Sequence, residues 1–266
     1  MQVLIIGCGG TGSALIKEFA RYLSNKKHNN DVSVTLIDGD IIEEKNLDRQ
    51  AFTVSDLNHN KAEAMAFAVK EVFDVDFYHY PYYITRVEQM EDLLRKGNGT
   101  IIIGCVDNHH CRQVLHQIFE EQSSIVYIDA ANEYQTGEVV VAIKVNGIVL
   151  SPDRAAYFPE ILDKRQKSVE ELSCEEMNQS SPQHIVTNMM AANICLAQML
   201  NILEIARDAD INQTQAKDWL GILETLGIIF YLRPYSNNLL KRLVKTPKLY
   251  FYDTGLVEER SGCTER

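Results

Sequence analysis

The sequence contains no cluster of cysteines, and none of its cysteines belongs to a C-x-x-C pair. They lie scattered along the sequence, at Cys8, Cys105, Cys111, Cys174, Cys195 and Cys263. Structural zinc sites and disulfide frameworks need regularly spaced cysteines, so we expect neither of them here. Scattered thiols are typical of proteins in a reducing compartment, which predicts a cytoplasmic location.

Long apolar runs and an excess of basic residues are missing as well. No uninterrupted apolar run approaches the roughly 20 residues of a membrane span. No basic segment precedes an apolar helix at the start of the sequence, so we expect no signal peptide. The net charge of −11 disfavours a general affinity for nucleic acid or anionic membranes. The 266 residues, 45% of them apolar, suffice for one large domain or a medium domain with an appendage.

The first fourteen residues read as a strand, a glycine loop and the start of a helix. Residues 1–6 are apolar and rich in β-branched side chains, and apolar residues at helical spacing follow the loop. Between them, Gly7, Gly9 and Gly12 fit the G-x-G-x-x-G pattern, with Ser13 next. Such glycines let the main chain approach a phosphate, while the helix N-terminus offers free N–H groups. This stretch predicts nucleotide binding; the alternative is a tight turn whose small residues serve packing.

Strand-like and helix-like segments alternate along most of the chain. The expected strands are residues 32–37, 75–84, 100–104 and 125–129, followed by a hairpin of residues 138–145 and 147–150. The expected helices are residues 61–73, 87–96, 111–122 and 183–207, the last after a long polar crossing loop at 151–182. Alternating strands and helices form parallel sheets covered on both faces. The order predicts an α/β fold: a Rossmann-like, doubly wound, mostly parallel sheet with a mixed antiparallel edge.

Charged residues follow two of the expected strands. Asp38 ends the second strand, where dinucleotide-binding folds place the carboxylate that holds the ribose, although its distance from Gly12 exceeds the usual ~20 residues. Asp107 follows a later strand, on the edge where such sheets bind ligands. Between them, Arg49 and Lys61 offer a planar fork and a point charge for phosphate oxygens. The alternatives are a turn aspartate and solvated surface cations.

Together these motifs resemble the ThiF family, which includes the adenylyltransferases of thiamine and molybdopterin biosynthesis and the adenylation domains of ubiquitin-activating enzymes. The resemblance covers about residues 1–206, and the sequence looks nearest to the PRTRC-system ThiF proteins. The motifs that carry it are Gly7-x-Gly9-Gly10-x-Gly12-Ser13, Asp38-x-Asp40, Asn46-Leu47-Asp48-Arg49-Gln50, Lys61, and Cys105-x-Asp107-Asn108 with Arg112.

The resemblance implies binding of ATP and Mg²⁺ and formation of an acyl-adenylate on a separate ubiquitin-like or sulfur-carrier protein, by a homodimer. The residues that it implies for nucleotide binding are Gly7, Gly9, Gly10, Gly12, Asp38, Asp40, Asn46, Arg49, Gln50, Lys61, Asp107 and Asn108. Among them, Asp38 would hold the ribose hydroxyls and Asp107 the Mg²⁺ ion. The residues that it implies for catalysis are Arg49, Lys61, Asp107 and Cys174.

Cys174 lies about where the family places its thioester or persulfide cysteine. Glu175 and Glu176 follow it directly, and nearby carboxylates raise a thiol pKa, so the alternative is an incidental loop thiol. The chain also departs from the family pattern. The paired C-x-x-C zinc site is absent, and so are the N-terminal helix that lends an arginine to a partner's site and any fused ubiquitin-like sequence. A non-catalytic nucleotide-binding scaffold of a plasmid or mobile element is therefore an alternative function, and an NAD-dependent oxidoreductase is a weaker one.

The sequence changes character near residue 207. Residues 207–257 resemble the winged-helix-like region of a bacterial family of AAA-type predicted ATPases, without that family's nucleotide-binding core. The stretch 217–253 is net basic, which permits nucleic-acid contact, but a truncated module favours a packing appendage or a remnant of gene fusion. We expect three segments: a ThiF-like domain at 1–206, the winged-helix-like fragment at 207–257, and a disordered tail at 258–266.

Overall fold

The structure is a computed structural model, which describes residues 1–25, 32–95, 99–163, 184–208, 229–232 and 248–251. Its contacts divide the chain into two units, Met1–Leu200 and Asn201–Arg266. The segment boundaries that we expected near residues 206 and 257 remain predictions.

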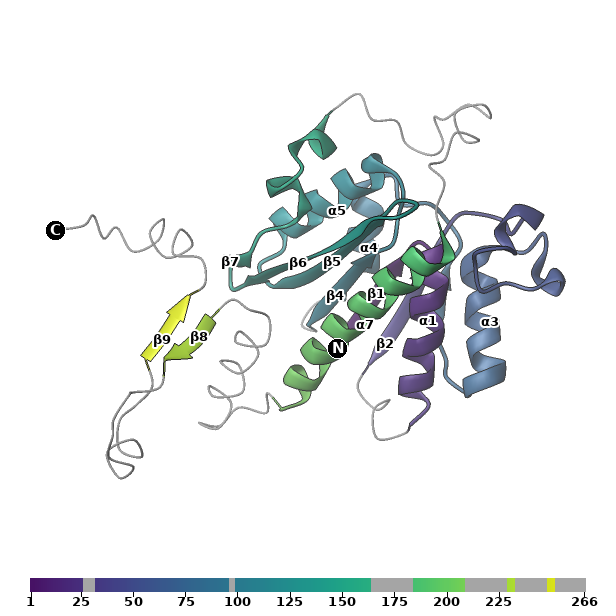
Figure 1. Ribbon diagram of the computed structural model, residues 1–266, viewed down its shortest axis with the longest axis horizontal. Coiled ribbons are helices and arrows are strands. Elements are labelled where there is room, and N and C mark those ends of the chain that lie inside the picture. The colour runs from purple at the N-terminus through teal and green to yellow at the C-terminus, as the bar shows by residue number, and fades with distance from the viewer. Residues whose placement is uncertain (26–31, 96–98, 164–183, 209–228, 233–247, 252–266) are drawn as a thin grey trace. The chain divides into compact units, whose positions relative to one another are not determined.

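The first unit is built on a seven-stranded sheet with the order β3-β2-β1-β4-β5-β6-β7 (Figure 1). The strands are β1 (Gln2–Ile6), β2 (Ser33–Ile37), β3 (Tyr78–Tyr80), β4 (Thr100–Gly104), β5 (Ile125–Asn132), β6 (Gly137–Val145) and β7 (Ile148–Ser151). The first five of these pair in parallel, whereas β6 and β7 add as antiparallel strands. The predicted mostly parallel sheet with an antiparallel edge is confirmed.

The helices cover both faces of this sheet, with α1 and α3 in front and α4 and α5 behind in Figure 1. Their bounds are α1 (Gly10–Leu23), α3 (Lys61–Phe73), α4 (Val87–Leu93), α5 (His109–Glu121) and α7 (Ile185–Asp208), with 3-10 turns η1 (Glu44–Asn46), η2 (Val54–Asp56), η3 (Arg154–Ala156) and η4 (Pro159–Leu162). The apolar positions that predicted α1, including Leu15, Ile16 and Phe19, are fully buried. Burial of this stripe fixes α1 against the sheet and so fixes the loop that precedes it.

Two elements are shorter than the segments in which the sequence places them. The segment 75–84 holds the expected third strand at Tyr78–Tyr80, which ends there because Pro81 cannot donate a ladder hydrogen bond and β3 lies at the sheet edge. The expected helix at 87–96 ends at Leu93. The described part of the expected crossing loop contains η3 and η4.

Helix α7 includes one segment, Ile185–Glu204, that is long and apolar enough to cross a membrane by length and composition, with a mean hydropathy of 1.3. A search of the sequence for uninterrupted apolar runs does not find this segment, because asparagines and a glutamine interrupt it. Inside the protein, Ala191, Ala192 and Cys195 of this helix are buried. Core helices of soluble proteins meet the same criterion, so the finding is weak support for a membrane span.

The second unit contains a two-stranded antiparallel pair, β8 (Ile229–Leu232) and β9 (Lys248–Phe251). The helices and turn expected for a winged-helix-like fragment fall mainly in residues 209–228 and 233–247, outside the described residues. The tail expected to be disordered also lies outside them.

Candidate nucleotide site

The glycine loop between β1 and α1 has a backbone that only glycine accommodates. Gly7 has a φ of +91°, and a Cβ on it would lie 2.5 Å from the carbonyl oxygen of Cys105. A Cβ on Gly12 would lie 1.8 Å from the carbonyl oxygen of Gly7. These contacts press the first turn of α1 against the ends of β1 and β4.

The space beside Gly9 is different, because a Cβ there would meet only Gln50 Nε2, at 3.9 Å. Gly9 is the N-cap of α1, and no side chain caps the helix or places an acid in its first turn. An uncapped helix N-terminus presents free N–H groups and a partial positive charge. The loop therefore has the main-chain chemistry of an anion site, with open space at one glycine.

Asp38, directly after β2, holds the loop through main-chain hydrogen bonds. Its Oδ2 accepts from the N–H of Cys8 at 2.6 Å, and its Oδ1 accepts from the N–H of Asp40 at 2.8 Å. Burial and, next, the charge of Asp40 raise the pKa of Asp38 to about 6, although Lys61 opposes this. Each carboxylate oxygen can accept a second hydrogen bond, so its predicted role toward ribose hydroxyls is chemically open.

Asp40 and Lys61 form a close ion pair next to Asp38, with Nζ and Oδ2 2.6 Å apart. The Tyr83 hydroxyl donates a hydrogen bond to the other carboxylate oxygen of Asp40. Burial disfavours charge on both partners. Even so, the Lys61 charge holds the pKa of Asp40 below its usual value, while Asp38 and Asp40 raise that of Lys61. At neutral pH the pair is therefore ionised.

Asn60 connects this cluster to helix α3. Its Oδ1 accepts from the N–H groups of Ala62 at 2.9 Å and Glu63 at 3.2 Å, which caps the helix. Its Nδ2 donates to the carbonyl oxygens of Asp38 at 2.9 Å and Asp40 at 3.1 Å. We did not single out Asn60 from the sequence, although an asparagine immediately before a helix is a recognisable cap signal. Tyr83, far along the chain from Asp40, carried no such signal.

The loop after β2 places Asn46, Arg49 and Gln50 in one turn. Asn46 is buried, its Oδ1 accepts from the N–H of Glu43 at 2.9 Å, and its carbonyl oxygen accepts from the N–H of Gln50 at 3.0 Å. Its side chain therefore organises the turn. Gln50 is buried beside Gly9, and its Oε1 has no hydrogen-bond partner among the described residues. Arg49 is half-buried in the same turn.

Asp107 and Asn108 follow β4. Asp107 is exposed, and its charge contributes to the raised pKa of Lys61 and of Tyr83, which places it within electrostatic reach of both. Asn108 caps α5, because its Oδ1 accepts from the N–H of Cys111 at 2.8 Å. Within the described ranges no group of three or more His, Cys, Asp or Glu side chains could hold a metal. A Mg²⁺ ion often takes only one or two carboxylates together with substrate phosphates, so Asp107 fits that role chemically.

Arg112 and Cys174, which the sequence analysis also named, do not belong to the cluster of Asp38, Asp40 and Lys61 in the described structure. Arg112 is buried, and it donates to Asp129 at 3.3 Å and to the carbonyl oxygen of Val106 at 2.6 Å. Its position therefore serves the packing of α5 on the sheet. Cys174 lies outside the described residues, and its role remains a prediction.

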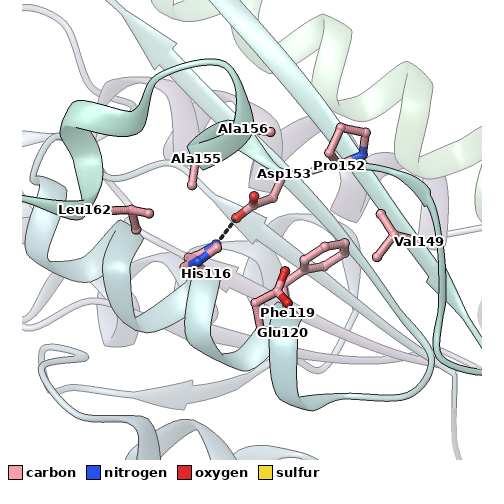
Figure 2. A pocket seen from close by; sticks show the side chains of 9 residues that line it. All are labelled: His116, Phe119, Glu120, Val149, Pro152, Asp153, Ala155, Ala156 and Leu162. Atoms are coloured by element: carbon pink, nitrogen blue, oxygen red, sulfur yellow. Dashed lines mark hydrogen bonds and ion pairs between the residues drawn. The ribbon is translucent and has the colours of Figure 1, made fainter. Parts of the chain in front are cut away.

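Two cavities accompany these elements. One, of about 470 Å³, borders the cluster and is lined by Gly39, Tyr80, Pro81, Tyr82, Tyr83, Arg86 and Gln89. The other, of about 250 Å³, is shown in Figure 2, where His116 on α5 points toward Asp153, with Nδ1 and Oδ2 2.7 Å apart. The remaining side chains labelled in Figure 2 are mainly apolar, and the described lining of this cavity includes neither Lys nor Arg, whereas Arg86 lines the first cavity.

The fold and this cluster define an α/β protein with a nucleotide-type glycine loop. The chain belongs to the ThiF family, which matches residues 1–219. Among solved structures it resembles Escherichia coli MccB with ATP, and MccB with AMPCPP and MccA, each at 18% identity and a TM-score of 0.51. Both alignments cover 76% of this chain and 55% of MccB, so the chain spans little more than half of that protein. At this identity the likeness shows the fold.

The C-terminal part has matches of its own. Residues 178–266 match a domain of unknown function, DUF8612. Uncharacterized proteins Rv2008c of Mycobacterium tuberculosis and Mb2031c of Mycobacterium bovis are 35% identical over 69 residues, 26% of this chain and 16% of each relative. The chain thus spans only a small part of those relatives. These matches name no ATPase, so the resemblance to AAA-type proteins remains a prediction.

Proposed function

We propose that this protein is an ATP-dependent adenylyltransferase, which activates the C-terminal carboxylate of a separate ubiquitin-like or sulfur-carrier protein. Membership in the ThiF family supports an adenylyltransferase-type activity, and the MccB structures with ATP support the choice of nucleotide. The observation that carries the proposal is the gathering of Asp38, Asp40 and Lys61 beside the uncapped, open glycine loop.

Each part of this region would have its own role in nucleotide binding. The free N–H groups at Gly9 would bind phosphate oxygens, and the Asp38 carboxylate would accept hydrogen bonds from the ribose hydroxyls. The cavity bordered by Tyr80, Tyr82 and Tyr83 would take the base, because aromatic and apolar walls suit a purine. This arrangement would place the phosphate chain over the loop that carries Arg49 and Gln50.

The reaction needs charge stabilisation more than covalent help from the protein. A carboxylate oxygen of the acceptor would attack the α-phosphorus of ATP, forming an acyl–phosphate bond while the bond to the leaving pyrophosphate breaks. Arg49 and Lys61 would balance the negative charge that develops on pyrophosphate, with Asn46 and Gln50 shaping the site. Asp107, with Asn108 beside it, would hold Mg²⁺, which when bound supplies further positive charge to the phosphates.

ATP–pyrophosphate exchange in the presence of purified ubiquitin-like and sulfur-carrier proteins tests this function. The wild-type protein should exchange label with at least one carrier, and Arg49→Ala and Asp107→Ala should abolish the exchange. Normal exchange by Asp107→Ala would refute the role assigned to that residue. Failure of the wild-type protein with every carrier would count against the activity itself.

The close pairing of Lys61 with Asp40 favours one alternative, a nucleotide-binding scaffold without catalysis. A lysine already held by carboxylates has less free charge for a leaving group. The scaffold predicts ATP binding by calorimetry with no adenylate on any carrier. Tight NADH binding without ATP binding would instead favour the oxidoreductase hypothesis.

Two finer parts of the proposal have separate tests. The first is homodimerisation, which analytical ultracentrifugation would report. The second is a nucleophilic role for Cys174, which predicts that Cys174→Ala still forms the acyl-adenylate but no thioester or persulfide product. A thiol-linked product that persists in this variant would exclude Cys174 as the nucleophile.

A further inference from the structure

A buried asparagine from α7 lies against the glycine loop. Asn188 has no exposed surface, and it stands near the start of α7, far in sequence from α1. Its Oδ1 accepts from Asn132 Nδ2 at 2.5 Å, and Asn132 Oδ1 accepts from the hydroxyl of Thr11 at 3.0 Å. The two hydrogen bonds link α7, through the end of β5, to the first turn of α1.

Asn188 also contacts the loop directly, at Gly10. A Cβ on Gly10 would lie only 1.9 Å from Asn188 Nδ2 and 2.6 Å from its Cγ. The amide therefore occupies the space that any larger residue at position 10 would need. Gly10 is thus small because of its neighbour on α7, whereas Gly7 is required by its contact with Cys105 and Gly12 by its contact with Gly7.

The remaining donor of this amide is unused. Asn188 Nδ2 is buried and has no hydrogen-bond partner among the residues that the structure describes. A buried N–H without an acceptor is unfavourable for folding, so its presence calls for another explanation. Its dipole lies beside the N-terminus of α1, where it adds to the positive potential of the free main-chain N–H groups.

We propose that Asn188 is a positioning residue of the phosphate site, acting through Gly10 and through Asn132 and Thr11. It holds the first turn of α1 in the geometry that presents its N–H groups, and its unpaired donor strengthens the attraction for anions. This inference rests on the proposed function, since it assumes that a nucleotide's phosphates lie at this loop. It predicts an effect on binding of the phosphates and none on binding of the nucleoside.

The decisive variant is Asn188→Asp, which keeps the size of the side chain and an acceptor for Asn132 but replaces the unpaired donor by a negative oxygen. Asn193→Asp is the matched control, because Asn193 is exposed on the same helix and gains the same charge. Calorimetry with ATP and with adenosine, together with a thermal melt, gives the readout. We expect Asn188→Asp to weaken ATP binding about tenfold or more while adenosine binding stays within about twofold of wild type.

Several outcomes would overturn the inference. Unchanged ATP binding by Asn188→Asp would do so, as would an equal loss for ATP and adenosine, which a merely structural role predicts. If Asn188→Asp does not fold, Asn188→Ser replaces it, and the same selective loss for ATP is expected. A wild-type protein that binds neither ATP nor adenosine would refute the proposed function itself. If the wild-type protein binds ATP and the Asn188 variant binds it equally well, only this inference is refuted.

Discussion

At the scale of single residues, Lys61 of the candidate site combines burial with a close ion pair. Its side chain is 7% exposed, it pairs with Asp40, and Asp38 lies near enough to raise its pKa. Removing the ammonium would leave two neighbouring carboxylates without their cation. Loss of one partner of a buried pair costs far more than loss of a surface pair.

Lys61→Met should therefore lower the free energy of unfolding by about 1–3 kcal/mol, less than for a fully buried pair because Asp40 is partly exposed. Lys70→Met is the control, since Lys70 pairs with Asp74 and Asp76 on the solvent-exposed side of α3. Urea denaturation of the three proteins is the measurement. Equal unfolding free energies for the two variants would show that the Lys61–Asp40 pair contributes no more to stability than the exposed pairs of Lys70.

A pH dependence follows from Asp38, whose pKa of about 6 lies above the usual 3.8 because of burial and the charge of Asp40. The folded state holds this proton more tightly than the unfolded state. Its contribution to stability therefore falls as the pH rises from about 4 through about 6. The carboxylate, which is the better acceptor for ribose hydroxyls, forms over the same range.

Adenosine binding should therefore strengthen as the pH rises through about 6, with Lys61 remaining charged throughout. Adenosine is the appropriate probe because it carries no phosphate that titrates in this range. Calorimetry at several pH values gives the curve, and Asp38→Asn should flatten it. A pH-dependent curve that persists in Asp38→Asn would assign the titration to another group.

Among the elements, the start of α3 links a helix cap to the candidate site. Asn60 accepts hydrogen bonds from the first turn of α3 and donates to the main chain of the 38–40 turn. A single asparagine can serve both because its amide is an acceptor on one side and a donor on the other.

Asn60→Asp separates these two tasks, since a carboxylate can still cap α3 but cannot donate to the carbonyl oxygens of Asp38 and Asp40. We expect a loss of about 1–2 kcal/mol in the free energy of unfolding and weaker ATP binding. Asn108→Asp, a change at the cap of α5, should leave the unfolding free energy nearly unchanged. Similar unfolding energies for both variants would show that the donors of Asn60 contribute little.

For the whole molecule, α7 lies where the two family matches overlap. The ThiF match ends at residue 219 and the DUF8612 match begins at 178, so α7, at Ile185–Asp208, lies within both. The division between the two compact units, after Leu200, also falls within this helix. A helix shared in this way supplies the fold with Asn188, a residue that the first domain's own motifs do not contain.

The fold was largely predictable from local patterns. Helix α3 begins at Lys61 and ends at Phe73 as the sequence indicates, and β4 has the expected bounds, because apolar periodicity and caps act over a few residues. The candidate site was less predictable. Patterns indicated Asp38 and Lys61, but they did not indicate that Tyr83 donates to Asp40, since that contact joins residues 43 positions apart.

The sequence alone determined the alternation of strands and helices, the glycine loop and each of the short motifs typical of the ThiF family, because each of these depends on residues that are close together in the chain. Only the tertiary structure decided which of the charged groups pair, and that Asn188 lies against Gly10 with an unused donor. The physical reason is that burial and hydrogen bonding between distant segments depend on packing, and packing is established only when β1, β5 and α7 are assembled.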